Sequence, residues 1–543
     1  MKNKLFVLSS ILLLALSACG RGGASPQEED DGIIHLQEDT STSYNIDSSI
    51  SNANGSMSYE IFVRSFYDTN NDGIGDLNGV TYKLDYLKSL GIKTIWLMPI
   101  MPSPSYHGYD VSDYYNVHSD FGTLADFDNL VTKAREKNID IMIDMVLNHC
   151  SSQNNYFKTA KSDYKNGNTG ENSKANWFTW SDRPVDGYHS SGDGLYYESR
   201  FDGGMPDFNL DNQAVRNEIE NIVKFWIQDH GVKGFRLDAV LYYYYQVTDK
   251  NVEFLSWLED VTHKYDPNFY MVGEAWDGNN VVNSYYNSKC DSFFRFDNSI
   301  SGGLYSLINF AKGNGKANTL ISNIEKADAK MKTNNPNGYS SFFLSNHDQD
   351  RISRSFNETQ NKVAAQLYCL LPGTPFMYYG EEIQLVGTRN TGPDDLSDVR
   401  RRLPMIWSKT NKTGECQFPE KNRQDLNTTK QVELGVDDKL SEPFSLVNHY
   451  RYVISIRNKY PLFKQGVITN MTDVLETEIK YVCAYKISLG NDYIIVVHNL
   501  GAENVAVTAP GTEILDQINT SHLIPELSNG KLKLAAQSTV IMR

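Results

Sequence analysis

The chain contains few cysteines. Only six occur in 543 residues, and no two of them stand in a C-x-x-C spacing. The five that follow Cys19 are scattered and odd in number, which argues against a disulfide framework and against a zinc site built on paired thiolates. We expect these five to be small hydrophobic side chains inside the protein.

Long hydrophobic runs are also missing, apart from one at the start of the chain. Two lysines precede an apolar stretch from Leu5 to Leu16, which is too short to span a membrane and has the layout of a secretory signal. The ending Leu-Ser-Ala-Cys19 resembles a bacterial lipobox, which implies cleavage before Cys19 and lipidation of its thiol. We therefore predict a signal peptide over residues 1–18 and an extracytoplasmic protein held at the cell surface or outer membrane by this anchor alone.

Positive charge is scarce. The chain has 51 Lys and Arg against 67 Asp and Glu, a formal net charge of −16. This charge favours solubility and argues against nucleic acid or an anionic lipid surface as a partner. We expect a monomer.

Short apolar runs rich in β-branched and aromatic residues recur along the chain. Eight of them have the length of a buried strand, and they begin near residues 59, 92, 139, 232, 268, 291, 340 and 374. Between most of them lie amphipathic patterns whose apolar residues return every three or four positions. This alternation predicts an α/β protein with a (β/α)8 TIM barrel, in which the active site forms at the carboxyl ends of the strands.

Other segments do not follow the repeat. Residues 150–204 are polar, aromatic and Gly-rich without clear periodicity, and they are too long for a loop, so we predict an inserted domain after the third strand. Short alternating runs predict a C-terminal antiparallel β-sandwich over 464–543. The barrel then comprises 56–149 and 205–463, and the polar residues 19–55 are predicted to form a flexible tether.

Four carboxylates each stand where a predicted barrel strand ends: Asp144, Asp238, Glu274 and Asp348. Holding a carboxylate near a hydrophobic core costs desolvation free energy. Four such acids in series, separated by helix-sized intervals, are therefore unexpected from packing needs alone. They indicate an enzyme active site.

The stretches around these acids resemble a known family. DMVLNH, GFRLDAV, GEAW and SNHD, in that order, resemble the sequence motifs of glycoside hydrolase family 13, the α-amylase family. A fifth stretch, MPDFN at Met205 to Asn209, is also similar to the family. The resemblance covers residues 56–543 and includes the insertion after the third strand and the terminal sandwich.

The resemblance implies a catalytic role for three acids. Asp238 would be the nucleophile that forms a covalent glycosyl-enzyme, Glu274 the general acid and then the base, and Asp348 a group that binds ring hydroxyls and stabilises the transition state. Arg236 lies two positions before Asp238 on the same face of a strand, so its cation would keep Asp238 ionised. For retaining hydrolysis we predict a separation near ~5 to 5.5 Å between the carboxyl groups of Asp238 and Glu274.

The resemblance also implies a set of substrate-binding residues. One is the aromatic residue that stacks under a bound glucose ring, and two are histidines that donate hydrogen bonds to sugar hydroxyls. The whole set is Tyr109, His107, Asp110, His149, His347 and Arg236. Asp144 is expected to organise the site through Arg236, whereas Trp177, Trp180 and Tyr242–Tyr245 either extend the cleft or only pack.

A loop from Asp68 to Asp76 reads DTNNDGIGD and repeats the start of an EF-hand, with oxygen-bearing side chains at positions one, three, five and nine and Gly at six. The glutamate of position twelve is absent, since Gly79 stands there. Family members that resemble oligo-1,6-glucosidases bind calcium with such a loop. The resemblance therefore implies a structural Ca²⁺ held by Asp68, Asn70, Asp72, Asp76 and the carbonyl of Ile74.

A second calcium, between barrel and insertion, stays open. Many α-amylases carry a Lys-His pair shortly after the nucleophile, and here Leu241 and Tyr242 occupy that stretch. Asn148 nevertheless matches one of that site's usual ligands.

The residue after the nucleophile is Ala239, which by resemblance favours α-1,4 over α-1,6 bonds. A lipid-anchored location favours a long polymer as substrate. We therefore predict an endo-acting α-amylase on starch and maltooligosaccharides, with an α-glucan as its partner.

Several alternatives remain. The Asp68 loop and MPDFN also resemble exo-acting α-glucosidases, including oligo-1,6-glucosidases, and neopullulanases. A transglycosylase would use the same site with sugar in place of water. A catalytically inactive starch-binding relative is a further class, against which the intact Asp238, Glu274 and Asp348 argue.

Overall fold

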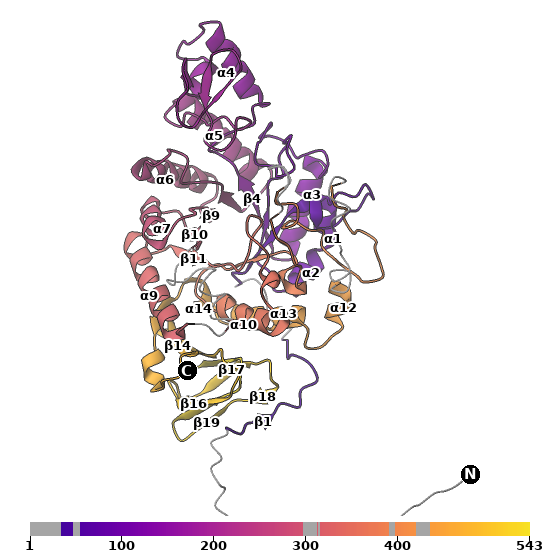
Figure 1. Ribbon diagram of the computed structural model, residues 1–543, viewed down its shortest axis with the longest axis vertical. Coiled ribbons are helices and arrows are strands. Elements are labelled where there is room, and N and C mark those ends of the chain that lie inside the picture. Colours follow the sequence, from indigo (N-terminus) through magenta and orange to yellow (C-terminus); the bar gives the residue numbers. More distant parts are fainter. Residues whose placement is uncertain (1–33, 47–54, 297–311, 313–314, 390–396, 420–434) are drawn as a thin grey trace, which may run out of the picture.

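The computed structural model describes residues 34–46, 55–296, 312, 315–389, 397–419 and 435–543 (Figure 1). The predicted signal peptide, residues 1–18, and the predicted lipidation site Cys19 lie outside these residues. In the described part of the chain, no helix is long and apolar enough to cross a membrane.

Eight parallel strands form the barrel, in the order β11-β10-β9-β8-β4-β3-β2-β12. A parallel bridge between Phe343 and Phe376 joins the segment after β11 to β12 and closes the ring. The predicted (β/α)8 barrel is thus confirmed, and each predicted strand region contains one strand of it. The strands are β2 (Ser58–Ile61), β3 (Thr94–Leu97), β4 (Asp140–Met145), β8 (Gly234–Leu237), β9 (Tyr270–Gly273), β10 (Ser292–Phe294), β11 (Tyr339–Ser341) and β12 (Phe376–Tyr378).

Helices surround the strands (Figure 1). Their starts follow local capping chemistry: Thr123 and Asp126 form a capping box at α3, and the Asn212 side chain accepts two backbone N–H groups at α5. The helices around the barrel are α1 (Leu77–Tyr82), α2 (Leu84–Ser89), α3 (Leu124–Glu136), α5 (Gln213–Lys224), α6 (Thr248–Tyr265), α7 (Asn279–Tyr285), α9 (Ala317–Asn334), α10 (Glu358–Cys369), α13 (Leu446–Lys459) and α14 (Leu462–Gln465).

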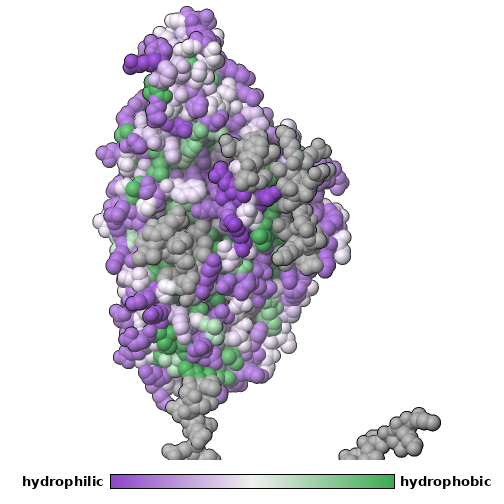
Figure 2. All heavy atoms as spheres, in the orientation of Figure 1, coloured by the Kyte–Doolittle hydropathy of each residue, from purple (hydrophilic) through white to green (hydrophobic). Residues whose placement is uncertain are grey.

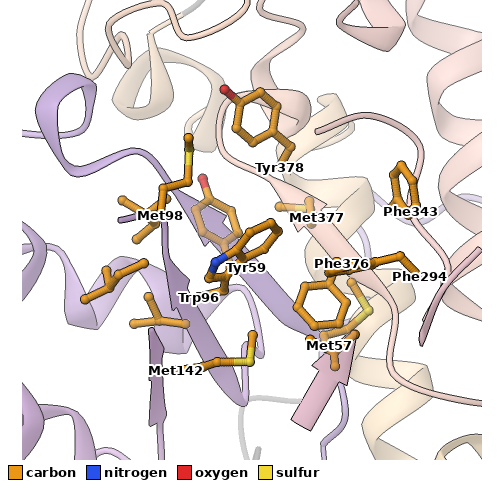
Figure 3. Packing of buried hydrophobic residues seen from close by; sticks show 14 of the residues in the cluster. Met57, Tyr59, Trp96, Met98, Met142, Phe294, Phe343, Phe376, Met377 and Tyr378 are labelled. Carbon is orange, nitrogen blue, oxygen red and sulfur yellow. The ribbon is translucent and has the colours of Figure 1, made fainter. Parts of the chain in front are cut away.

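Large side chains fill the barrel interior (Figure 3). Trp96 packs on Phe294 with ring centroids 5.6 Å apart, and Phe294 packs edge-on against Phe376 at 4.9 Å. All three are buried. The interior is therefore a solid core, and a substrate can reach the strands only from their ends.

The segment between β4 and α5 forms the insertion, at the end of the molecule that carries α4 in Figure 1. It consists of α4 (Asn155–Lys165) and a three-stranded antiparallel sheet in the order β5-β7-β6. Trp180 stacks on Phe157 and Tyr164 inside this unit. The strands are β5 (Trp180–Ser181), β6 (Tyr188–Ser190) and β7 (Tyr196–Glu198).

Two antiparallel sheets follow the barrel, as predicted for the C-terminal part. Their orders are β13-β14-β15-β21-β17 and β16-β20-β19. Val482 and Val497 of the first sheet and Val505 and Leu532 of the second belong to one buried cluster, so the sheets pack face to face. The strands are β13 (Val467–Asn470), β14 (Val482–Leu489), β15 (Asp492–Asn499), β16 (Val505–Thr508), β17 (Ile514–Ile518), β19 (Glu526–Ser528), β20 (Lys531–Leu534) and β21 (Ser538–Met542).

Residues 34–46 correct the predicted tether over 19–55. β1 (Gln37–Glu38) pairs with β18 (Leu523–Ile524) in antiparallel register, and the Tyr44 ring packs against Tyr452 of α13. Backbone pairing and one partly buried aromatic ring hold this polar stretch, which its composition alone did not reveal. The tether prediction therefore fails for residues 34–46.

The visible surface in Figure 2 is mostly hydrophilic, with hydrophobic residues scattered in small groups. Single hydrophobic residues on a mostly hydrophilic surface are usual in a protein whose core is filled with apolar side chains.

Candidate active site

A cavity of about 820 Å³ lies at the carboxyl ends of the barrel strands. Residues of the insertion, including Phe201 and Met205, form part of its wall. Among the residues predicted for catalysis and substrate binding, those that line it are His107, Tyr109, Asp110, His149, Asp238, Glu274 and Asp348. The fold thus brings together residues that are up to 241 positions apart in the chain, from His107 to Asp348.

Arg236 is the centre of the site. Its Nη1 donates to Asp144 Oδ1 at 2.9 Å and to Asp238 Oδ1 at 2.6 Å, and its Nη2 lies 3.0 Å from Glu274 Oε1. The guanidinium side chain is only 1% exposed. One fixed cation therefore contacts three of the four acids noted in the sequence.

Strand register explains this grouping. Asp144 on β4 is paired directly with Arg236 on β8, so the two side chains lie next to each other at the same level. Asp238 follows Arg236 by two positions and shares its face. On the other side, Leu237 pairs with Gly273 of β9, which places Glu274 one residue further up the neighbouring strand end.

The environment of Glu274 sets its protonation. Burial raises the pKa of Glu274 to about 7, with Asp238 adding to the rise and Arg236 opposing it. Glu274 Oε2 also accepts the backbone N–H of Ala239 at 2.9 Å. Ala239 has a left-handed φ of 49°, a conformation that costs an L-residue about 1 kcal/mol or more and that here orients its N–H toward Glu274. Glu274 can therefore carry a proton near neutral pH.

His347 and Asp348 form a second charged centre. His347 Nε2 lies 3.0 Å from Asp348 Oδ2, and His347 Nδ1 lies 2.6 Å from Glu60 Oε1. Burial alone would lower the pKa of His347, but the Asp348 and Glu60 carboxylates raise it to about 10. Burial would likewise raise the pKa of Asp348, yet His347 and Arg402 hold it well below its usual range. His347 is thus a cation and Asp348 an anion at neutral pH.

Tyr109 links the two centres. Its hydroxyl lies 2.6 Å from His347 Nε2 and 3.0 Å from Asp144 Oδ2. Its ring is parallel to those of His347 and His107, within 17° and 24°. The ring position is thereby fixed beside the cavity.

Asp110 and His149 are held by their neighbours. Asp110 Oδ1 accepts hydrogen bonds from the hydroxyls of Ser103, at 2.5 Å, and Ser105. His149 Nε2 lies 3.2 Å from the carbonyl oxygen of Tyr109. Burial lowers the pKa of His149.

The aromatic residues left open by the sequence divide into two groups. Trp177 and Trp180 do not line the cavity and pack inside the insertion. Tyr242 does line it, and its ring lies 4.6 Å from Phe201 and 5.6 Å from Tyr245.

Some lining residues were missed by the sequence reasoning. Arg402 contacts Asp348 Oδ1 at 3.1 Å, and Trp276 stacks on Phe296 at 4.6 Å while 44% exposed. Trp276 stands in the GEAW stretch, but Arg402 lies in a segment with no pattern that marks it. Glu60 ends β2 in the same way that Asp144 ends its strand, so the signal used for the other acids could have found it.

Asn148, which matches a family calcium ligand, donates through Nδ2 to Asp207 Oδ1 at 3.0 Å. Burial raises the pKa of Asp207 to about 7. The hydrogen bond from Asn148, in the DMVLNH stretch, to Asp207, in the MPDFN stretch, thus joins the barrel to the end of the insertion.

The Asp68–Asp76 loop is tightly wound. Asp68 Oδ2 accepts the Gly73 N–H at 2.7 Å, and Asp76 caps α1 by accepting the Gly79 N–H at 2.7 Å. In the described part of the chain, no group of three or more His, Cys, Asp or Glu side chains is arranged to hold a metal. Within the same residues, no Lys or Arg forms an ion pair with Asp68, Asp72 or Asp76. The predicted calcium site therefore stays a prediction.

A TIM barrel that gathers Asp238, Glu274 and Asp348 around one cavity has the architecture of a glycoside hydrolase. The family model for the alpha-amylase catalytic domain matches residues 60–466. The chain therefore belongs to the alpha-amylase family, glycoside hydrolase family 13, and is a glycoside hydrolase.

The chain is similar to proteins that carry different enzyme names. Alpha-amylase 3 of Dictyoglomus thermophilum is 37% identical, over 81% of this chain and 84% of the relative. Oligo-1,6-glucosidase of Parageobacillus thermoglucosidasius is 28% identical, over 83% of this chain and 91% of the relative. The solved structure of Eubacterium rectale Amy13B superposes with a TM-score of 0.83 at 34% identity, covering 91% of this chain and 96% of that one.

Because two carboxylates raise the pKa of His347, we expect the free energy of unfolding to depend on pH. A folded-state pKa of about 10, above the ordinary 6.5, stabilises the fold fully below pH 6.5, and this contribution is lost as pH rises toward 10. Glu60→Gln removes one of the anions, so the loss should occur at lower pH than in the wild type. Urea unfolding at a series of pH values measures this shift.

The exposed Glu136→Gln on α3 is the matched control and should follow the wild type at every pH. If Glu60→Gln and the wild type lose stability over the same pH range, Glu60 does not hold the charge on His347.

Proposed function

We propose that the enzyme hydrolyses α-1,4-glucosidic bonds of starch and maltooligosaccharides with retention of configuration, as an endo-acting α-amylase. The observation that carries this proposal is Arg236, which contacts the carboxylates of both Asp238 and Glu274, two residues that line the cavity. Arg236 Nη1 donates to Asp238 Oδ1 at 2.6 Å, while burial raises the pKa of Glu274 to about 7. A two-step retaining mechanism requires a carboxylate nucleophile beside a second carboxyl group that can carry a proton near neutral pH, which Glu274 can do.

In the first step, the Asp238 carboxylate attacks the anomeric carbon while Glu274 gives its proton to the glycosidic oxygen, which leaves with the bond electrons. The product is a glycosyl ester on Asp238 and an ionised Glu274. In the second step, Glu274 takes a proton from water as the water oxygen attacks the same carbon, and Asp238 leaves as a carboxylate. Both residues return to their starting states.

The second charged centre would act on the sugar ring. Asp348 would accept hydrogen bonds from ring hydroxyls, and Tyr109 would support the ring from its face. His347, whose two ring nitrogens face Glu60 and Asp348, would hold Asp348 in place. Because His347 and Arg402 keep Asp348 ionised, a negative charge stands near the positive charge that develops on the ring in the transition state.

Two observations support the α-1,4 and endo assignments. The relative at 37% identity is named an alpha-amylase. The aromatic residues Phe201, Tyr242 and Trp276 line the 820 Å³ cavity in addition to the carboxylates, so a chain longer than one sugar would find further contacts there.

A second candidate is an exo-acting glucosidase on α-1,6 bonds. Two relatives that match this chain over 91% and 92% of their own length are named oligo-1,6-glucosidase and glucan 1,6-alpha-glucosidase. The same site would also serve a neopullulanase or a transglycosylase, since only the shape of the cleft and the acceptor differ.

The isosteric change Glu274→Gln should lower kcat on amylose by about 10³-fold or more, because the leaving oxygen loses its proton donor. Binding of amylose should persist. Unchanged turnover in this variant would contradict the assigned role. Glu442→Gln, on the surface and paired with Lys439, is the matched control and should keep full activity.

Sizing the products at early times separates the candidates. We expect a spread of maltooligosaccharides from amylose. Glucose alone would replace the proposal by an exo-glucosidase, panose from pullulan would indicate a neopullulanase, and chains longer than the substrate would indicate transglycosylation.

We also propose that the Asp68–Asp76 loop binds a structural Ca²⁺. Three acids in nine residues, with Gly73 allowing the tight turn at φ 90°, support this proposal. Asp68, Asn70, Asp72, Asp76 and the Ile74 carbonyl would hold the ion, which would neutralise their charge and stiffen the loop.

Calcium should raise the melting temperature of the wild type, and chelation should lower it. Asp72→Asn should weaken this response, while Asp85→Asn, on the exposed side of α2, should leave it unchanged. A melting temperature that calcium does not alter would contradict the site.

For the location we propose a monomer anchored to the cell envelope through a lipid on Cys19. The sequence before Cys19 supports this, and the chain would then join the folded part at residues 34–46, where β1 pairs with β18. Cys19→Ser should move the protein from the membrane fraction to the soluble extracytoplasmic fraction. An unchanged membrane fraction would contradict the anchor.

A further inference from the structure

Glu60 is a buried acid beside the active site that the proposed reaction does not use. It lies on β2, and its backbone is paired on both sides, with Tyr378 of β12 and Trp96 of β3. The residue is 1% exposed and is not among those that line the catalytic cavity, so it has no access to a substrate there. Because burying a carboxylate costs free energy unless a partner offsets the cost, its charge needs an explanation.

The partner of Glu60 is His347. Glu60 Oε1 lies 2.6 Å from His347 Nδ1, and the other ring nitrogen, Nε2, lies 3.0 Å from Asp348 Oδ2. A carboxylate can only accept a hydrogen bond, so these contacts place a proton on each ring nitrogen. The His347 side chain is fully buried, and a cation there requires the anions on its two sides.

The Nε2–H group of His347 also faces Tyr109. The Tyr109 hydroxyl oxygen lies 2.6 Å from Nε2 and 3.0 Å from Asp144 Oδ2. Because Nε2 carries a proton, the hydroxyl accepts on that side and donates its own proton to Asp144. The direction of the Tyr109 hydrogen bond therefore depends on the proton at Nε2.

Loss of that proton would reverse the contacts. A neutral His347 would keep its remaining proton on Nδ1, toward Glu60, and Nε2 would become an acceptor. The Tyr109 hydroxyl would then turn from Asp144 to Nε2, and Asp348 would face a lone pair in place of a donor. Both charged centres of the site would change at once.

We propose that Glu60 is a positioning residue for the glycosyl transfer, which acts by keeping a proton on both ring nitrogens of His347. The inference rests on the proposed function, because it concerns the same reaction. Asp144 accepts from Arg236 Nη1 at 2.9 Å, and Nη1 also donates to Asp238 at 2.6 Å. The chain of hydrogen bonds that begins at Glu60 thus ends at the proposed nucleophile.

Several titratable or charged groups face His347. They are Glu60 from β2, Tyr109 from the loop after β3, Asp144 from β4, the adjacent Asp348, and Arg402, whose Nε donates to the His347 carbonyl oxygen at 3.3 Å. Burial alone would lower the pKa of His347, and Asp348 and Glu60 raise it to about 10. Asp348 lines the cavity and Glu60 does not, so the charge of Glu60 can be removed without altering a substrate contact.

The test follows glycosyl transfer from α-glucosyl fluoride, whose leaving group needs no acid. With Glu274→Gln in the background, the rate of fluoride release in the first turnover is measured against pH, so the titration of Glu274 does not shape the profile. Glu60→Gln keeps the size of the side chain and an acceptor oxygen but removes the charge. Glu381→Gln is the matched control, because Glu381 is also buried, accepts from the hydroxyls of Tyr368 and Tyr450 and does not line the cavity.

We expect the rate in the Glu274→Gln background to fall on the alkaline side as His347, with its pKa of about 10, loses a proton. With Glu60→Gln added, the fall should occur about 1–3 pH units lower, the shift that an opposite charge at contact distance produces. Glu60→Asp keeps the charge but draws it back from Nδ1, so its profile should lie between these two. Glu381→Gln should leave the profile of the background unchanged.

An alkaline fall that Glu60→Gln does not move would overturn the proposal, even if the rate were lower at every pH, because a merely structural role lowers the amount of active protein without shifting the profile. If the background protein and the wild type release no fluoride, the proposed function fails. Nitrogen NMR of the histidine side chains, assigned with His347→Gln, then decides the role of Glu60 on its own. An unchanged pKa of His347 in Glu60→Gln would overturn it.

Discussion

The ion contacts of Arg236 are the constraint on which the site depends. A guanidinium that is 1% exposed loses most of its hydration, and an unpaired charge there would cost several kcal/mol. Asp144, Asp238 and Glu274 offset this cost together, each within 3.0 Å of the same side chain. Burial raises the pKa of Glu274, Arg236 opposes this rise and the Asp238 carboxylate adds to it. Geometry and protonation are therefore set by a single arrangement.

The barrel supplies this arrangement through register. Parallel strands with paired residues at the same height bring side chains of β4, β8 and the end of β9 together at one edge of the barrel. The hydrophobic core below them is filled, so the acids stay at the carboxyl ends of the strands. The second centre uses the same edge: His347, which follows β11, contacts Glu60 on β2 and its neighbour Asp348. Tyr109 lies between the centres, so a sugar placed on its ring would meet nucleophile, acid and stabilising anion at once.

Much of the fold and of the site could be predicted from the sequence, because the strands and the acids at their ends follow from local patterns. Apolar runs identified the eight strands, four of these runs led to the acids Asp144, Asp238, Glu274 and Asp348 at their ends, and the period-two pattern identified the C-terminal sheets. Features that depend on distant contacts were not predicted. Residues 34–46 are polar and dock through backbone pairing and Tyr44, and Arg402 reaches Asp348 from a segment without periodicity. The environment of Glu274, which includes the amide of Ala239, also follows only from the folded chain.

The central claim is that Asp238, held by Arg236, is the nucleophile. The most direct measurement is peptide mass spectrometry of the Glu274→Gln variant after reaction with an activated α-glucosyl fluoride, whose leaving group needs no proton. The account predicts a glycosyl adduct on the peptide that contains Asp238, directly after β8. An added small nucleophilic anion, which needs no base, should release it by attacking the anomeric carbon, with the Asp238 carboxylate as the leaving group. An adduct on another residue, or turnover of the fluoride to the inverted sugar without any adduct, would contradict it.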